Sequence, residues 1–271
     1  MPRISVNDVE IYYDVQGKGE PLLFIAGFGV GHWVWFRQVP SLSQQFRTIV
    51  FDNRGIGSSG DSQAPYTIEM LADDAAALIE GLGYGSAHIV GASMGGFIAQ
   101  ELALRHPACV RSLVLACTSF GGPNHVPASP EVLKFFLSPA DINSEERIRQ
   151  GQEIAFTREF IAAHPDVVEM VIQLRLTHPV SEETFRRQVQ AVMSFNAEDR
   201  VARITAPTLV ITAAEDVLIP PENSRRLAAR IPGARLTIFE RGGHAFFIER
   251  AEAFNRAVAD FISDVSRQHP M

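Results

Sequence analysis

The sequence predicts an α/β fold, in which a mostly parallel central sheet is flanked by helices and carries an all-helical insertion. Three observations predict it. Short continuous apolar runs, typical of strands buried on both faces, alternate with helical patterns along much of the chain. Residues 122–200 contain helical spacing of apolar positions without an obvious strand. A Gly-x-Ser-x-Gly motif, from Gly91 to Gly95, joins an apolar run to a helical pattern.

Composition limits the kinds of partner that the chain can have. The 271 residues are 46% apolar and 20% charged, as in ordinary soluble globular proteins. A net charge of −7 without a basic cluster argues against nucleic acid and anionic membranes as partners. No run reaches the roughly 20 apolar residues of a membrane span, and the N-terminus has no signal-like core. We therefore expect a cytoplasmic protein, and no pattern specifies its oligomeric state.

Cysteine and histidine positions give no indication of a metal site. The two cysteines, Cys109 and Cys117, lie in or beside an apolar strand-like run, so we expect buried thiols rather than a disulfide. No Cys/His spacing matches a set of metal ligands. The sequence therefore predicts neither a metal nor an organic cofactor.

The expected elements follow from local pattern. Residues 4–15 alternate with period two around Asn7-Asp8, which predicts a β-hairpin at the edge of the sheet. Buried strands are expected at residues 22–25, 48–51, 110–116, 208–212 and 236–239, and a short one is expected at 89–90, directly before the serine motif. Helices are expected around the aromatic residues 33–36, at 67–82, from the serine motif to about 106, and at roughly 250–265. Alternation of strands with helices implies right-handed crossovers and parallel strands.

The insertion begins after a turn-rich stretch at residues 121–130. Helical spacing then occurs in four segments: 131–137, 144–156, 165–176 and 181–195. We expect a core domain formed by residues 1–121 and 201–271. Residues 122–200 are expected to form a helical cap over the carboxyl edge of the sheet, not an independent domain.

Ser93 is the candidate nucleophile. A sharp strand-to-helix turn forces it into a strained backbone conformation, and Gly91 and Gly95 lack the Cβ atoms that would collide there. The turn lifts the hydroxyl above the carboxyl edge of the sheet. It also places the Met94 amide in the first turn of a helix, where amides lack partners and the dipole is positive. The motif alone would also fit a glycine-rich turn with a solvated serine, but its strand and helix favour the nucleophile.

A serine nucleophile needs a base, and the base needs an orienting acid. Among eight histidines, His244 directly follows the last predicted strand, on the loop edge where Ser93 should emerge. The acid should follow the strand at 208–212. Glu215 and Asp216 are adjacent in that loop, and periodicity does not choose between them. The chain order is then serine, acid, histidine.

With this order the sequence resembles the α/β-hydrolase superfamily, and within it the small capped serine esterases and lactonases. The resemblance covers essentially the whole chain and implies the α/β-hydrolase fold. It implies Ser93 as the nucleophile and His244 as the base. It also implies Asp216 as the acid, because Asp216 and Pro220 match the Asp-x-x-x-Pro pattern of the family.

Two further loops carry the resemblance. Residues 26–29 match the oxyanion loop, which implies the backbone amides of Phe28 and Met94 as oxyanion donors. Ala26 stands where many members have histidine, a departure that leaves the Phe28 amide in place. Residues 52–59 are similar to a loop whose role in the family is structural.

The resemblance implies cleavage of a small-molecule carboxylic ester or lactone with an apolar acyl group, and acyl-homoserine lactones and enol-lactones are both possible. Ser93 argues against dehalogenases and epoxide hydrolases, which use an aspartate nucleophile. Carbon–carbon bond hydrolysis and cofactor-free perhydrolysis use the same triad and stay open, as does a non-catalytic ligand receptor. Candidates to line the substrate cleft, which ordinary packing would also explain, are Trp33, Phe135, Phe136, Ile219 and Phe246.

Overall fold

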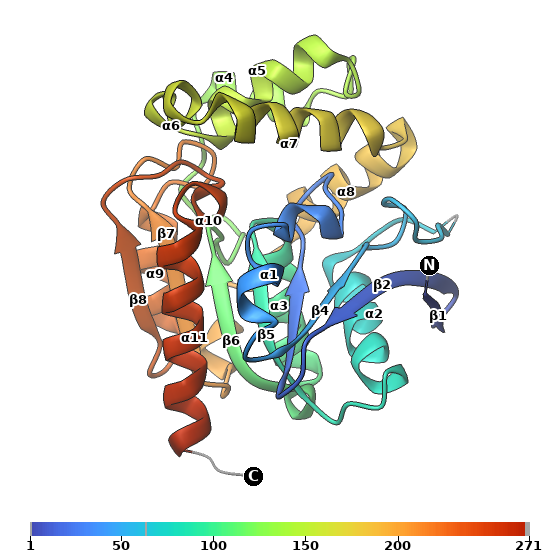
Figure 1. Cartoon of the computed structure of the whole chain (residues 1–271), viewed down its shortest axis with the longest axis vertical. Coiled ribbons are helices and arrows are strands. Elements are labelled where there is room, and N and C mark those ends of the chain that lie inside the picture. The colour runs from blue at the N-terminus through green and yellow to red at the C-terminus, as the bar shows by residue number, and fades with distance from the viewer. Residues whose placement is uncertain (1, 63, 269–271) are drawn as a thin grey trace.

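Eight strands form one sheet in this computed structural model, which describes residues 2–62 and 64–268 (Figure 1). The strand order is β1-β2-β4-β3-β5-β6-β7-β8. The strands span Arg3–Val6 (β1), Val9–Gln16 (β2), Pro21–Ile25 (β3), Arg47–Phe51 (β4), Ala87–Ala92 (β5), Val110–Ala116 (β6), Thr208–Ala213 (β7) and Arg235–Phe239 (β8). Strands β3 to β8 run parallel, whereas β1 and β2 are antiparallel at one edge, as the hairpin pattern predicted.

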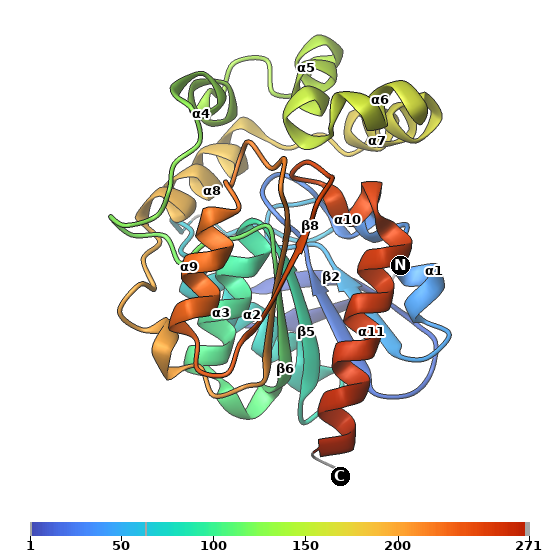
Figure 2. The same ribbon diagram turned by 90° about the vertical axis from the view of Figure 1, so that its left-hand side faces the viewer.

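The central strands are apolar throughout because helices cover both faces of the sheet. Every residue of β3, β5 and β7 is buried. Figure 2 shows α2 (Ile68–Gly81), α3 (Met94–Arg105) and α9 (Glu222–Arg230) on one face, with α1 (Val39–Leu42) and α11 (Ala251–Gln268) on the other. These two layers give two large apolar clusters, one on each face.

Five helices lie between β6 and β7 in the chain, above the carboxyl ends of the strands (Figure 1). We call them the cap helices: α4 (Pro130–Leu137), α5 (Glu145–Ala155), α6 (Arg158–Ala163), α7 (Pro165–Thr177) and α8 (Glu182–Ser194). Four of them begin at a hydroxyl side chain that accepts the backbone N–H three residues on, which satisfies an otherwise unpaired amide. These N-caps are Ser129, Ser144, Thr157 and Ser181.

Two local expectations differ from the structure. The aromatic segment near residue 33 forms only a 3₁₀ turn, His32–Trp35, followed by the short α1. Pro40 can occupy the first turn of α1 but not a helix interior, so one continuous helix cannot form there. Helix α6 was not expected as a separate element. Cys117 is buried, whereas Cys109 is only half-buried.

The loop after β4 has the structural role expected of it. Asp52 accepts the backbone amides of His32 and Ser58. The buried guanidinium of Arg54 donates to both carboxylate oxygens of Asp74, at 2.6 and 2.8 Å. These bonds fix the loop against the β3 end and α2.

Within the described ranges, no helix combines the length and apolarity needed to cross a membrane.

Candidate active site

Ser93 lies at the turn from β5 into α3 in a backbone conformation that few non-glycine residues adopt, with φ 57° and ψ −123°. Such strain costs about 1–3 kcal/mol and persists only where the surroundings enforce it. Here the Ser93 amide donates to the Ala116 carbonyl at 2.9 Å, and Thr118 Oγ1 donates to the Ser93 carbonyl at 2.9 Å. Ala116 is the last residue of β6 and Thr118 lies just after it, so the neighbouring strand and the loop that follows it hold the turn.

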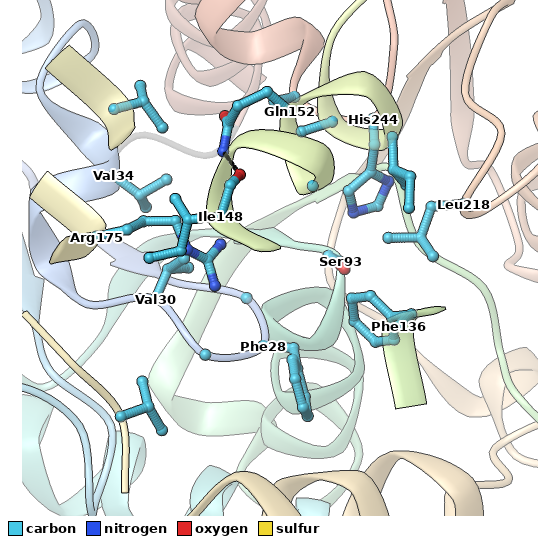
Figure 3. A pocket seen from close by; sticks show the side chains of 18 of the residues that line it. Phe28, Val30, Val34, Ser93, Phe136, Ile148, Gln152, Arg175, Leu218 and His244 are labelled. Atoms are coloured by element: carbon cyan, nitrogen blue, oxygen red, sulfur yellow. Dashed lines mark hydrogen bonds between the residues drawn. The ribbon is translucent and has the colours of Figure 1, made fainter. Parts of the chain in front are cut away.

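The two glycines of the motif permit a close approach of backbones. A Cβ on Gly95 would overlap the carbonyl oxygen of Ile25, and a Cβ on Gly91 would overlap that of Gly95. Neither residue has room for a side chain. The helix can therefore pack directly against β3 and β5, with Ser93 at the carboxyl end of β5. Figure 3 shows the Ser93 side chain at the cavity.

His244 follows β8 and contacts Asp216 at the end of β7. Its Nδ1 lies 2.8 Å from Asp216 Oδ2. An ionised carboxylate only accepts hydrogen bonds, so Nδ1 carries the proton and Nε2 of the neutral ring is left as an acceptor. Asp216 Oδ1 in turn accepts the amides of Leu218 and Ile219, at 2.9 and 2.8 Å. The carboxylate is thus fixed on both oxygens and buried behind the imidazole.

Glu215 lies outside this arrangement. Its carboxylate points to the surface, where it pairs with Arg241 at 3.0 Å, and both side chains are substantially exposed. Only Asp216 of the two adjacent acids reaches a histidine. The geometry therefore agrees with the acid that the resemblance implied.

Two backbone amides are available beside Ser93. Among the described residues, neither the Phe28 amide nor the Met94 amide has a hydrogen-bond acceptor. The loop that carries Phe28 is close to the serine, because a Cβ added to Gly27 would lie 3.2 Å from the Ser93 Cβ. The next amide, that of Gly29, donates to Gln188 Oε1 of α8 at 2.8 Å and ties the loop to the cap helices. The two amides expected as oxyanion donors are thus without acceptors among the described residues.

Two cavities meet at Ser93. The α5–α7 cavity, of about 190 Å³, lies under α5 and α7 and also contains His244 (Figure 3). The α4–α8 cavity, of about 250 Å³, lies between α4, α8 and the start of α3. Their walls share four residues: Phe28, Ser93, Phe136 and Leu218. A molecule bound at Ser93 can thus extend in two directions.

The predicted cleft residues divide between the cavities, with one exception. Trp33, Phe135 and Phe136 line the α5–α7 cavity, and Ile219 lines the α4–α8 cavity. Phe246 lines neither, which corrects its assignment. Its ring has no exposed surface and packs against Phe239 and Phe254, because helix α10 (Phe246–Glu249) directs it into the core.

Polar residues of the cap helices were missed by sequence reasoning. Arg147, Gln152 and Arg175 line the α5–α7 cavity. A signal for Arg175 did exist: it continues the apolar face of α7, four residues after Val171. A charged side chain on the buried face of a helix is unusual enough to mark a site.

No group of three or more His, Cys, Asp or Glu side chains within residues 2–62 and 64–268 is arranged to hold a metal ion.

Burial raises the pKa of the Cys117 thiol well above its usual value, and the nearby Asp216 charge adds to the effect. Cys117 therefore stays a thiol behind the serine turn.

A parallel sheet with a strained serine after a central strand, and an Asp–His pair after the last two strands, defines an α/β hydrolase. A model of the alpha/beta hydrolase fold matches residues 20–251, and the chain belongs to this family. Its class is therefore that of a hydrolase.

The names of similar proteins state several different activities. The chain is 30% identical over 267 residues to a protein of Azorhizobium caulinodans named as a proposed carbamate hydrolase, RutD, covering 98% of this chain and all of that one. The crystal structure of the enol-lactonase from Burkholderia xenovorans LB400 matches with a TM-score of 0.87 and 28% identity, over 97% of this chain and 100% of that chain. A thermophilic esterase from Thermogutta terrifontis matches with a TM-score of 0.83 and 26% identity, over 98% and 99%.

Proposed function

We propose that this protein is a serine hydrolase that cleaves carboxylic esters or lactones through an acyl-enzyme. One observation carries the proposal: His244, whose Nδ1 is paired with the buried Asp216, lies in the wall of the same cavity as the strained Ser93. Ser93 is the nucleophile, His244 the general base and Asp216 the residue that orients the imidazole. The family resemblance and the lactonase and esterase neighbours support the same reaction class.

The first half of the reaction forms the acyl-enzyme. Nε2 of His244 takes the proton of the Ser93 hydroxyl as its oxygen attacks the carbonyl carbon. Asp216 holds the Nδ1 proton in place and stabilises the imidazolium. The alcohol oxygen then leaves with the proton that His244 returns. Water, activated by the same histidine, hydrolyses the acyl-enzyme in the second half.

Charge that develops on the carbonyl oxygen is stabilised by the amides of Phe28 and Met94. These donors are already in position before the reaction, so little reorganisation is needed when the charge forms. Each such donor is worth about 3 kcal/mol in comparable sites. Met94 is also the first residue of α3, where the helix dipole adds favourable potential.

The two cavities fit the two halves of an ester. With the carbonyl at Ser93, the acyl group enters one cavity and the alcohol group the other, and a lactone ring can fill the junction. The shared wall of Phe28, Phe136 and Leu218 is apolar, as expected for an uncharged reacting centre.

Turnover of p-nitrophenyl butyrate tests the proposal. We expect Ser93→Ala to lower kcat by roughly 10⁴-fold or more, as for other serine nucleophiles, while circular dichroism stays unchanged. A fluorophosphonate should label the wild type at Ser93 only. Ser41→Ala is the matched control, because Ser41 is exposed on α1. Wild-type rates in the Ser93 variant would contradict the proposal.

Reactions that share this triad are separated by the choice of substrate. Wild type is assayed with a carbamate, a γ-lactone, an acyl-homoserine lactone, a β-diketone and peracid formation from acetate and peroxide. We expect ester and lactone hydrolysis to have the highest kcat/KM. Tight binding without turnover of any substrate would instead indicate a receptor.

A further inference from the structure

The guanidinium of Arg175 points into the α5–α7 cavity from α7 (Figure 3). It forms no hydrogen bond and no ion pair with the part of the chain that the structure describes, residues 2–62 and 64–268. The guanidinium lies close to the loop beside Ser93, because a Cβ added to Gly29 of that loop would lie 3.6 Å from Arg175 Nη2. Burial and the nearby charge of Arg147 lower the pKa of Arg175, yet arginine stays charged at neutral pH.

The charge of this cavity is opposite to that of the protein. Arg147 and Arg175 line it, and no Asp or Glu of the described residues does. The chain as a whole carries a net charge of −7. Most of the remaining lining is apolar, so little in the wall screens the two cations.

The two arginines differ in what they contact. Arg147 Nη2 donates to the carbonyls of Phe135 and Ser138, at 2.6 and 2.7 Å, and its guanidinium lies 4.6 Å from the Phe135 ring. Arg147 thus fixes the connection between α4 and α5. Among the residues that the structure describes, the guanidinium of Arg175 has no such partner. Arg175 is half-buried in the wall of a largely apolar cavity, where a cation without a partner is more stable when an anionic group lies beside it.

We propose that Arg175 binds a carboxylate carried by the substrate, so that the preferred esters or lactones have an acyl part ending in a carboxylate. This inference rests on the proposed hydrolase function. The planar guanidinium can donate two parallel N–H bonds to one carboxylate, which suits a single anionic group. The methylenes between the carboxylate and the reacting carbonyl then lie against the apolar wall.

The arrangement orients such a substrate. In Figure 3, Arg175 and His244 reach the cavity from opposite sides, with Ser93 between them in the view. A carboxylate at Arg175 therefore directs the acyl part into the α5–α7 cavity. The alcohol part is directed into the α4–α8 cavity, whose wall has no Arg, Lys, Asp or Glu among the described residues.

A matched pair of substrates tests the inference. Mono-p-nitrophenyl adipate carries a free carboxylate, and its methyl ester has the same length without the charge. A charge-assisted hydrogen bond of about 1.5–3 kcal/mol corresponds to roughly 10- to 100-fold in kcat/KM. We expect wild type to favour the anionic substrate by this factor and Arg175→Met to lose the preference. Arg175→Lys should keep part of it, because lysine keeps the charge but not the fork.

Two results would overturn the inference. An equal loss on both substrates in Arg175→Met would indicate general stabilisation of the oxyanion, and no preference in wild type would remove the need for an anion site. Arg186→Met is the control for net charge, because Arg186 is exposed on α8. It should leave the preference within about 2-fold, since exposed charges are screened.

Binding without turnover separates this inference from the proposed function. We expect monomethyl adipate to bind Ser93→Ala at least about 10-fold tighter than Ser93→Ala/Arg175→Met by calorimetry. Dimethyl adipate should not distinguish the two variants. If wild type cleaves no ester, the proposed function fails, and this comparison still decides the anion site. Equal binding of monomethyl adipate to both variants would contradict the role of Arg175.

Discussion

Asp216 Oδ2 lies 2.8 Å from Nδ1 of His244, although 28 residues separate the two in the chain. The adjacent Glu215 turns to the surface and pairs with Arg241. Two neighbouring carboxylates at the end of β7 therefore have different surroundings. Asp216 is buried and hydrogen-bonded on both oxygens, whereas Glu215 is partly exposed to solvent.

These surroundings predict different effects of neutralising each acid. We expect Asp216→Asn to lower kcat by about 10⁴-fold, as in the serine protease in which the equivalent change imposes the wrong histidine tautomer. Glu215→Gln, the matched control, should change kcat less than about 3-fold, because a surface ion pair contributes at most about 1 kcal/mol. Steady-state kinetics on one p-nitrophenyl ester measures both. Comparable losses in the two variants would place the acid elsewhere.

Phe136 lies at the junction of the two cavities, with its ring centroid 4.9 Å from that of Phe28. Phe136→Ala should therefore change the preference for both acyl and alcohol length. Phe135→Ala should affect only the group in the α5–α7 cavity. Uniform apolar contacts stabilise ground and transition states together, so KM should change more than kcat. Each methylene that loses contact costs about 0.8 kcal/mol.

The measurement for these two variants is kcat/KM over a series of acyl and alcohol lengths. Met170→Ala is the control, because Met170 is exposed on α7 and lines neither cavity. Profiles that shift by one constant factor for every length would show that the rings only hold the cap helices together.

Substitution of Gly95 should greatly lower the stability of the folded protein. Because a Cβ there would overlap the Ile25 carbonyl, Gly95→Ala must separate α3 from β3. Overpacking of this kind costs about 1–3 kcal/mol or more. Gly85→Ala is the control, since a Cβ at Gly85 meets nothing within 4 Å. Urea unfolding compares the two, and a Gly95 variant as stable as wild type would contradict the close approach.

The stability of the folded protein should depend on pH through His88. It is buried on β5, where Nδ1 lies 2.8 Å from Ser112 Oγ, and burial lowers its pKa more than the nearby Glu20 charge raises it. The unfolded chain then binds a proton that the folded chain does not. The stabilisation is complete above the unfolded pKa of about 6.5 and is lost as the pH falls below it.

Replacing the histidine tests this dependence. We expect the free energy of unfolding of wild type to decrease between pH 7.5 and 5.5, and that of His88→Gln to decrease less over the same range. His125→Gln is the control, because His125 lies in an exposed loop. Identical slopes in wild type and the His88 variant would show that other groups set the pH dependence.

Local pattern determined much of this protein. The buried strands were recognisable because parallel strands covered on both faces need continuous apolar runs. The serine turn was recognisable because only glycine fits where α3 meets β3 and β5. The cap helices were recognisable from apolar spacing, although α6 was missed, because a six-residue helix contains too few turns to show a period. The chain order of Ser93, Asp216 and His244 also follows from pattern, since each follows a predicted strand.

Only the tertiary structure decided which of two neighbouring side chains faces the site. Periodicity does not separate Asp216 from Glu215, and only the family resemblance favoured Asp216 before the structure placed it. Periodicity likewise does not separate Phe246 in the core from Phe247 at the α5–α7 cavity wall. The sequence also does not show that the guanidinium of Arg147 is bonded to carbonyls, whereas that of Arg175 has no such bond among the described residues. The physical reason is that direction and partners depend on segments distant in the chain. Gly29 and Gln188, bonded across 159 residues, show how such contacts place the cap helices over Ser93.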